Sequence, residues 1–402
     1  MIKHYLDVAL RSFWRQKWMT LIKVVALALG FASFLAAFVV SDYLSSVDAS
    51  FADAKRIYVM RTAFQWPNST TSLPFMPYST GRLAKILKNE NPELEAVARM
   101  SGEDRVAIKA GNQKSYRAVG YADPELLKIF NLPFIAGDPK SALAGPNSAI
   151  ITKRAAEAIF GTANVIGKTV RIRDTSDVTI TAVIGDIRAP SILGRSIQNE
   201  PFDILTTIKV FDDVRPPDAV RTTSDESGWF TNNFYTFVLF PKRGSLTLAE
   251  FNHRLVDFGG RHVPKDQGQC WFDAIPLSSL LRETIDVGFG RGSFGLSITT
   301  ILFVFGGLIL LVACLDFANL ATAQALARAK EIGMRKTVGA TSFDIFRQCL
   351  FEVALLGVAA LALSYIATGF IVFFLNRPED LGLRAPSLLK WDVWAFLGGA
   401  LL

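Results

Sequence analysis

The chain has 402 residues, half of them hydrophobic, and carries a formal net charge of +7. A soluble protein of this length usually contains fewer apolar residues, and the length predicts two or three domains. The charge does not by itself indicate a nucleic-acid partner, because many of the basic residues flank long apolar runs and have a simpler use there.

Residues 1–23 precede the first apolar run and are basic and amphipathic. Their pattern predicts a cytoplasmic helix that lies along the inner membrane surface and bends into the first span. The predicted interface residues are Arg11, Trp14, Arg15 and Trp18, because arginine and tryptophan suit the headgroup region. The alternative is that this segment is a plain cytoplasmic extension of the first span.

Three uncharged runs, at residues 24–40, 292–315 and 353–376, predict transmembrane helices over residues 24–44, 293–322 and 346–376. Each is long enough to cross a hydrocarbon core of ~30 Å, which takes about 20 residues. A predicted short periplasmic loop at 377–391 leads to residues 392–402, which we interpret as the start of a fourth span, truncated by the chain end. The alternatives are buried helices of a soluble protein and, for the first run, a cleaved signal peptide, which the long patterned segment before it disfavours.

Lysine and arginine set the predicted orientation. They gather before the first span and between the second and third spans, and positive charge near short loops stays in the cytoplasm. Residues 45–292 are therefore predicted to lie outside the cytoplasm, and residues 323–345 inside it. A domain of that length crosses the membrane whatever its charge.

The segment 45–292 is long enough to fold alone, and its pattern alternates strands with helices. It predicts mixed α/β units with an inserted middle portion rather than a sandwich. Local signals include a helix capped by Ser79 or Thr80, a hairpin that turns at Gly111, and a strand followed by a helix that Gly161 ends.

Residues 161–169, GTANVIGKT, approach the phosphate-binding pattern G-x-x-x-x-G-K-[ST], but one residue too many separates Gly161 from Gly167. A helix rather than a strand is predicted before this segment, and ATP is scarce outside the cytoplasm. The sequence therefore predicts no ATP site, no catalytic residue and no enzyme activity in this chain. The histidines are scattered and only Cys270 is predicted outside the membrane, so neither a metal site nor an intrachain disulfide is expected there.

Two stretches resemble a known family. AKEIGMRKTVGATSFDIFRQCLFE resembles the signature of FtsX-like permeases, the MacB-type ABC transporter subunits, and YADPELLKIFNLPFIAGDP followed by AIITKRAAEAIFG resembles the MacB-type periplasmic domain. The motifs occur in the family's order, and the resemblance covers nearly the whole chain. The chain departs from the family in lacking a true Walker A motif and in stopping inside the predicted fourth span.

The resemblance implies a membrane protein, an α-helical transmembrane bundle plus a large mixed α/β periplasmic domain with an inserted subdomain, placed here at about 120–205. It implies the permease subunit of an ATP-driven ABC transporter in the bacterial inner membrane, multi-pass and with a cytoplasmic N-terminus. Such a subunit transmits the motion of a cytoplasmic ATPase to the periplasmic domain for efflux or extraction of a substrate. It works as a homodimer, or as a pseudo-dimer with a second permease unit.

The same resemblance assigns the partners. ATP and magnesium belong to a separate cytoplasmic ABC ATPase, so this chain is expected to hold no cofactor and no metal. A periplasmic adaptor is a further implied partner, and nucleic acid is not. Two rival functions remain open, namely a membrane-anchored periplasmic sensor, which would need a cytoplasmic output module, and a scaffold that activates cell-wall hydrolases.

Under this resemblance the basic segment between the second and third spans couples the permease to the ATPase. A short helix over 331–338, ended by a glycine, would offer the ATPase a rigid contact, and Thr341 with Asp344 would cap the helix that follows. The predicted coupling residues are Lys330, Glu331, Gly333, Arg335, Lys336, Gly339 and Thr341. The alternative is a plain basic loop held inside by its charge.

The second predicted span holds two polar residues near its inner end, Asp316 and Asn319. An acid inside a membrane suggests function by default. We favour an interfacial or inter-helix hydrogen bond over a proton relay, because water can reach this end of the span. Gly306 and Gly307 in the same span permit close helix contact, with the first span or with a dimer mate.

Overall fold

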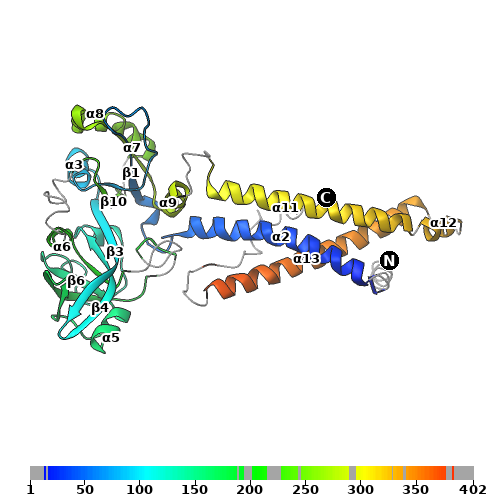
Figure 1. Cartoon of the computed structure of the whole chain (residues 1–402), viewed down its shortest axis with the longest axis horizontal. Helices are drawn as coiled ribbons and strands as arrows, with labels where there is room; N and C mark the ends of the chain where they lie inside the picture. The colour runs from blue at the N-terminus through cyan, green and yellow to red at the C-terminus, as the bar shows by residue number, and fades with distance from the viewer. Residues whose placement is uncertain are drawn as a thin grey trace. The chain divides into compact units, whose positions relative to one another are not determined.

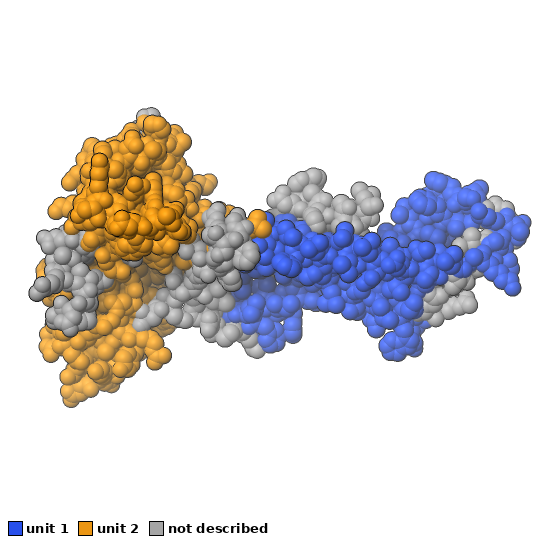
Figure 2. Space-filling view, turned by 45° about the horizontal axis from the view of Figure 1, so that its top comes forward, with its two compact units in different colours: residues 1–43, 297–402 blue, residues 44–296 orange. Residues whose placement is uncertain are grey.

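The computed structural model describes residues 13–14, 17–187, 190–193, 202–214, 228–242, 246–288, 296–327, 329–337, 341–376 and 383. The chain divides into two compact units, coloured separately in Figure 2. Residues 1–43 and 297–402 belong to the first unit, and residues 44–296 to the second. Each unit is described by itself below.

The first unit is helical. Its described elements are α2 (Lys17–Ser46, whose last residues enter the second unit), α11 (Ile298–Ala327), α12 (Ala329–Thr337) and α13 (Ser342–Asn376). The three long helices α2, α11 and α13 are each long and apolar enough to cross a membrane. Each covers most of one predicted span and continues beyond it at one end or both. The predicted fourth span lies outside the described residues, and of the predicted loop before it only Leu383 is described.

Helices α2 and α11 run antiparallel and in contact (Figure 1). At one end the rings of Phe38 and Phe303 lie 5.2 Å apart, and at the other the Lys23 ammonium donates a hydrogen bond to Gln324. A residue late in α2 thus contacts one early in α11, and a residue early in α2 contacts one late in α11, as in any antiparallel pair. Ala360 of α13 joins the same buried cluster, so the three long helices form one bundle.

Small residues bring α2 and α11 close together. A Cβ added to Gly30 would lie 2.8 Å from that of Ala313, and one added to Gly306 would lie 3.3 Å from the Phe34 Cα atom. Gly307 would meet nothing within 4 Å. Of the two glycines predicted to permit close contact, Gly306 therefore faces the first long helix and Gly307 does not.

The second unit is built on one mixed sheet of 11 strands. The strands are β1 (Ile57–Gln65), β2 (Ser79–Thr80), β3 (Ala96–Ala110), β4 (Gln113–Ala122), β5 (Phe134–Ala136), β6 (Ser148–Thr152), β7 (Thr169–Ile172), β8 (Ser176–Ile184), β9 (Ile204–Thr207), β10 (Asn232–Leu239) and β11 (Gln269–Pro276). Their order is β11-β1-β10-β3-β4-β9-β6-β8-β5, with β2 beside β10 and β7 beside β3 and β8. The pairs β4–β9 and β6–β8 are parallel, and the other pairs are antiparallel.

Short helices connect these strands. They are α3 (Leu83–Glu90), α4 (Leu126–Ile129), α5 (Lys153–Phe160), α6 (Ile208–Asp213), α7 (Leu248–Leu255), α8 (Phe258–His262) and α9 (Leu280–Gly288), with 3-10 turns at Ala54–Arg56, Lys265–Gln267 and Leu277–Ser279. The predicted insert contributes β5 to β9, which lie at one end of the same sheet and share a hydrophobic cluster with β3, β4 and α6.

Local sequence signals succeed where the partners are close in the chain. Thr152 caps α5 by accepting a hydrogen bond from the Ala155 N–H, and Gly161 ends this helix with a φ of 72° in the left-handed region. The predicted cap at Ser79 or Thr80 is wrong, because both residues form β2, where the Ser79 hydroxyl bonds Thr236 of β10. Helix α3 begins only at Leu83.

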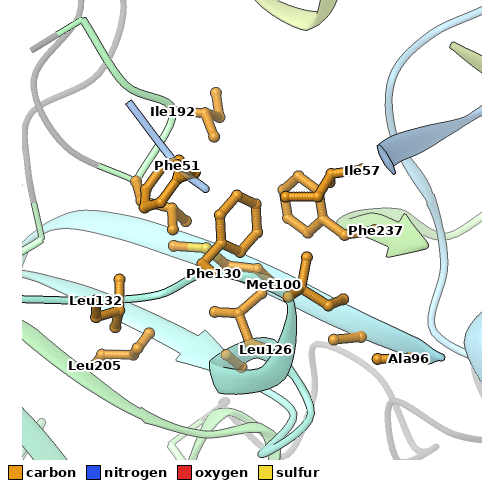
Figure 3. Close-up of a cluster of buried hydrophobic side chains, with 14 of the residues drawn as sticks. Phe51, Ile57, Ala96, Met100, Leu126, Phe130, Leu132, Ile192, Leu205 and Phe237 are labelled. Carbon is orange, nitrogen blue, oxygen red and sulfur yellow. The ribbon is translucent and has the colours of Figure 1, made fainter. Parts of the chain in front are cut away.

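In the second unit, called the outer unit below, a buried cluster packs the first residues against the sheet (Figure 3). Phe51, from the turn after α2, packs edge-on against Phe130 at 4.9 Å, and Phe130 packs edge-on against Phe237 of β10 at 5.0 Å. Ile192, from the segment 190–193, lies in the same cluster. Each such side chain contributes roughly 1.5–3 kcal/mol when fully buried. The turn that follows the first long helix is therefore part of the core.

Candidate functional site

Helix α12 is the short polar element between α11 and α13 (Figure 1). Only residue 328 separates α12 from α11, and residues 338–341 separate it from α13. Lys330 and Lys336 are exposed, as are Gly333 and Met334 between them. This polar helix therefore forms the short covalent connection between two long apolar helices.

The structure places the other predicted coupling residues around this helix. Glu331 and Arg335 lie within α12 one helical turn apart, and their side chains are outside the described part. Gly339 lies outside the described residues. Thr341 is exposed and directly precedes α13, where its carbonyl accepts a hydrogen bond from the Ile345 N–H. Thr341 thus occupies the cap position of α13, as the sequence predicted, and its capping by side chain stays a prediction.

The predicted membrane-interface residues lie before the first long helix and in its first turn. Trp14 and Trp18 are 80% and 70% exposed, and the Lys17 ammonium lies 6.0 Å from the Trp18 ring centroid. Such exposed indoles suit a lipid headgroup region, where the ring is amphipathic. Arg11 and Arg15 lie outside the described residues, so the predicted surface helix over residues 1–23 stays a prediction.

Asp316 and Asn319 both lie on the exposed face of α11. The structure does not bring them to the other predicted residues, which lie on α12 and at its ends. A helix rises 1.5 Å per residue, so Asp316 lies about 16 Å before the end of α11.

One polar contact near the predicted coupling segment was not predicted. Lys23 of α2 is only 4% exposed, and its ammonium donates a 2.6 Å hydrogen bond to the side-chain amide oxygen of Gln324 on α11. The same ammonium lies 5.5 Å from the Phe317 ring centroid. A buried ammonium is tolerated when a hydrogen bond and an aromatic face replace its water. Lys23 thus ties α2 to the end of α11 that leads into α12. The sequence offered only a basic residue at the start of an apolar run.

A second unpredicted contact lies where the chain leaves the outer unit. Arg61 of β1 makes a two-bond contact with Asp273 of β11, at 2.9 and 2.6 Å, and a 2.8 Å contact with Glu283 of α9. The two carboxylates are close enough to hold the guanidinium fork in one orientation. Helix α9 precedes α11 in the chain, so this triad holds in place the segment by which the chain leaves the sheet. No sequence signal could find it, because Arg61 is more than 200 residues from both acids.

In the GTANVIGKT segment, two backbone N–H groups already donate hydrogen bonds to backbone carbonyls of the protein. The Gly167 N–H donates to the Ile180 carbonyl and the Lys168 N–H donates to Val165, while the Lys168 ammonium lies 4.9 Å from the Phe160 ring centroid. A phosphate-binding loop needs such N–H groups free to point at the phosphates. These two are already used.

A cavity of about 280 Å³ lies between α3, α7 and α8. Of its charged lining residues, Glu90 pairs with Arg261 at 3.0 Å, and Arg254 pairs with Glu93 and Glu250 outside the lining. Within the described part of the chain, no group of three His, Cys, Asp or Glu residues could hold a metal ion.

Two family models match the chain in sequence. The MacB-like periplasmic core domain matches residues 20–238, which is more than half of the chain. The FtsX-like permease C-terminal region matches residues 303–402. The first match covers α2 and the outer sheet as far as β10, and the second covers most of α11 together with α12 and α13.

Several solved structures match a little more than half of the chain. A domain of a permease protein from Porphyromonas gingivalis is 20% identical with a TM-score of 0.45, and the match covers 56% of this chain and 92% of that one. The periplasmic region of MacB from Actinobacillus actinomycetemcomitans is 13% identical with a TM-score of 0.36, covering 56% and 92%. The extracellular domain of the noncanonic ABC-type transporter YknZ from Gram-positive bacteria is 11% identical with a TM-score of 0.34, covering 54% and 99%. No curated protein sequence matches this chain.

Proposed function

Because the chain belongs to the family of permeases with a MacB-like periplasmic core domain and an FtsX-like C-terminal region, we propose that it is the membrane subunit of an ATP-driven transport system. In this proposal the cytoplasmic partner is an ABC ATPase, and helix α12 is the element that the ATPase contacts. The chain itself catalyses no reaction and binds neither ATP nor magnesium, which belong to the partner.

The observation that carries the proposal is the geometry of α12. It is a short helix with exposed Lys330 and Lys336, separated by one residue from α11 and by four from α13. Helices transmit displacement along their axes better than flexible loops, because their backbone hydrogen bonds are internal. A plain loop held inside by charge needs basic residues but no such helix.

The cycle then follows from differential binding. An ATPase pair that closes on ATP favours whichever permease conformation fits the closed pair, and the free energy available is its difference in affinity for the two conformations. Motion of α12 passes to α11 and α13, and through the Lys23–Gln324 bond to α2. Both α2 and α11 connect in the chain to the outer unit, whose rearrangement drives efflux or extraction of a substrate on the periplasmic side.

The proposal also fixes topology and assembly. The basic residues around α12 and before α2 support a cytoplasmic location for both, and with it a periplasmic location for residues 45–292. The chain pairs with a second permease unit, as a homodimer or with a related unit, and a periplasmic adaptor is a further partner. The exposed apolar side chains of α11 and α13, such as Phe305 and Phe370, contact lipid or that second unit.

A charge reversal on α12 tests the ATPase contact. Lys330→Glu with Lys336→Glu should abolish co-purification of the ATPase, or remove the stimulation of ATP hydrolysis by the permease in nanodiscs, because cation-to-acid contacts become repulsive. The matched control is Lys109→Glu with Lys114→Glu, an exposed cross-strand pair on the β3–β4 hairpin. Wild-type stimulation by the α12 variant, or equal loss in the control, would refute the contact.

A further inference from the structure

Asp48 lies in the turn that follows the first long helix and precedes β1 in the chain. It is two residues beyond Ser46, the last residue of α2, and it belongs to the outer unit. Its side chain is fully buried, and its φ of 58° lies in the left-handed region, which aspartate tolerates better than most residues. A buried carboxyl in a strained turn is held there by its partners.

Those partners come from a segment more than 140 residues further along the chain. The Asp48 N–H donates a 3.0 Å hydrogen bond to the Pro190 carbonyl, and the Ile192 N–H donates a 3.1 Å bond to the Asp48 carboxyl. The Ser191 hydroxyl also donates to this carboxyl, and its oxygen accepts from the Leu193 N–H. We term this set of contacts between Asp48 and residues 190–193 the Asp48 clasp.

The clasp is seated in the core from both sides. Phe51, three residues after Asp48, and Ile192 and Leu193, beside its partners, all belong to one buried cluster (Figure 3). Ser191 is fully buried as well. The segment 190–193 follows β8, the strand that pairs with β5, β6 and β7. The clasp therefore joins the turn after α2 to the far part of the sheet and not only to its nearest strand.

We propose that Asp48 is a positioning residue that fixes the outer end of the first long helix to the sheet through residues 190–193, so that movement of this helix displaces the sheet. The proposal rests on the proposed function for its role in transport, whereas the clasp itself is a property of this chain alone. The Arg61 triad fixes the chain where it leaves the sheet, and the Asp48 clasp fixes it where it enters.

The carboxyl gives the clasp a pH dependence. Burial raises the pKa of Asp48 from 3.8 to about 7, against the opposing effect of the bonds from Ser191 and Ile192. Among the described residues, the groups that face the carboxyl are that hydroxyl and that N–H, and no charged side chain contributes to the shift. If the clasp opens, the carboxyl meets water and its pKa returns toward 3.8.

The sign follows from this difference. The closed clasp binds a proton more tightly than the open one, so acid favours the closed form. The stabilisation is complete below the pKa of the open form and is lost as the pH rises through about 7. A clasp without a titrating group would keep the same stability between about pH 5 and pH 8.

Hydrogen exchange in the full chain, reconstituted in nanodiscs, tests the clasp. The readout is the protection of the amides of residues 191–193, since Pro190 has no N–H, corrected for intrinsic exchange, between about pH 5 and pH 8. Asp48→Asn keeps an oxygen that accepts and tolerates the left-handed turn, but it cannot titrate. Asp48→Gly removes the carboxyl and fits the turn without strain. The control is Asp138→Asn, an exposed carboxyl that also accepts from one N–H and one serine hydroxyl.

The expected results differ among the variants. In the wild type, exchange at residues 191–193 should rise roughly tenfold or more from pH 5 to pH 7. The Asp48→Asn variant should keep protection with a flat profile, and the Asp48→Gly variant should exchange about tenfold faster at pH 5. The Asp138→Asn variant should match the wild type. A flat wild-type profile, or wild-type protection in the Asp48→Gly variant, overturns the proposal.

A second measurement separates this proposal from the proposed function. With the ATPase bound, the Asp48→Gly variant should still stimulate ATP hydrolysis, while the ATP-dependent change in exchange of strands β6 and β8 should fall at least severalfold. The Asp48→Asn variant should retain that change. If the glycine variant keeps it as well, Asp48 does not position the helix. If no ATPase associates with the wild type, the proposed function fails while the exchange profile still decides the clasp.

Discussion

At the scale of single residues, two arginines of the outer domain make similar contacts in different surroundings. Arg61 binds Asp273 and Glu283, and its side chain is 15% exposed, whereas Arg254 binds Glu93 and Glu250 at 43% exposure. Water screens the second set, so its contribution is small. Removing the first guanidinium leaves two carboxylates together with little solvent to separate them.

Arg61→Met should therefore lower the free energy of unfolding of the outer domain by about 2–3 kcal/mol, somewhat less than for a fully buried pair. Arg254→Met should cost less than about 1 kcal/mol. Thermal unfolding of the full chain in detergent, followed by tryptophan fluorescence, measures both. Equal losses in the two variants would show that burial does not set the difference.

Residue-level contacts of this kind were beyond the sequence. Lys23 could be predicted as a basic residue flanking a span, because positive charge before an apolar run is a local signal. Its bond to Gln324 could not, because it depends on how two helices some 300 residues apart in the chain pack together. Asp48 gave no local signal either.

At the scale of elements, prediction succeeded where structure is set by neighbours in the chain. The hairpin at Gly111 and the helix ended by Gly161 depend on turn and cap residues within a few positions. A short helix also follows the second long one, as predicted. The prediction of a helix cap at Ser79 or Thr80 was wrong because their partner strand, β10, lies more than 150 residues away. Long-range strand pairing overrides a local capping signal.

The helix pair α2–α11 offers a test at this scale. Gly306→Leu should destabilise the bundle by about 1–3 kcal/mol, because its side chain would press on the α2 backbone at Phe34. Its neighbour on the same helix, Gly307→Leu, should be nearly neutral, since nothing lies within 4 Å. Unfolding midpoints of the two variants in one detergent give the comparison. A greater loss for the Gly307 variant would place the contact on the other face.

At the scale of the whole molecule, the predicted fold class and family are confirmed by the two family matches, which place a MacB-like periplasmic core before an FtsX-like region. Composition and the spacing of apolar runs were enough to predict the spans, because a bilayer imposes helix length directly. The family followed from the quoted motifs. The substrate has no comparable signature, since it depends on surfaces formed by the outer sheet and its partners, which no motif in the chain encodes.

Orientation is the prediction that belongs to this scale. Cysteine in place of Thr337, on α12, should react with a membrane-impermeant maleimide only after permeabilisation, whereas cysteine in place of Glu157, on α5, should react in intact cells. Exposed Cys349 is first changed to serine, and Cys270 stays unreactive because burial raises its thiol pKa to about 12. Labelling at the Thr337 position in intact cells would contradict the predicted topology and indicate the opposite orientation.

The strand order also dictates when the outer sheet becomes complete during synthesis. Strand β1 emerges directly after the first long helix, yet both of its neighbours, β10 and β11, are made last. At about 5–20 residues per second, β1 waits on the order of ten seconds or longer for these two strands, and until then only its part near Thr62 is paired, with the nearby segment at 73–76. A nascent chain tethered to the bilayer is kept from its copies during that interval, so anchoring protects the slow-closing sheet from aggregation.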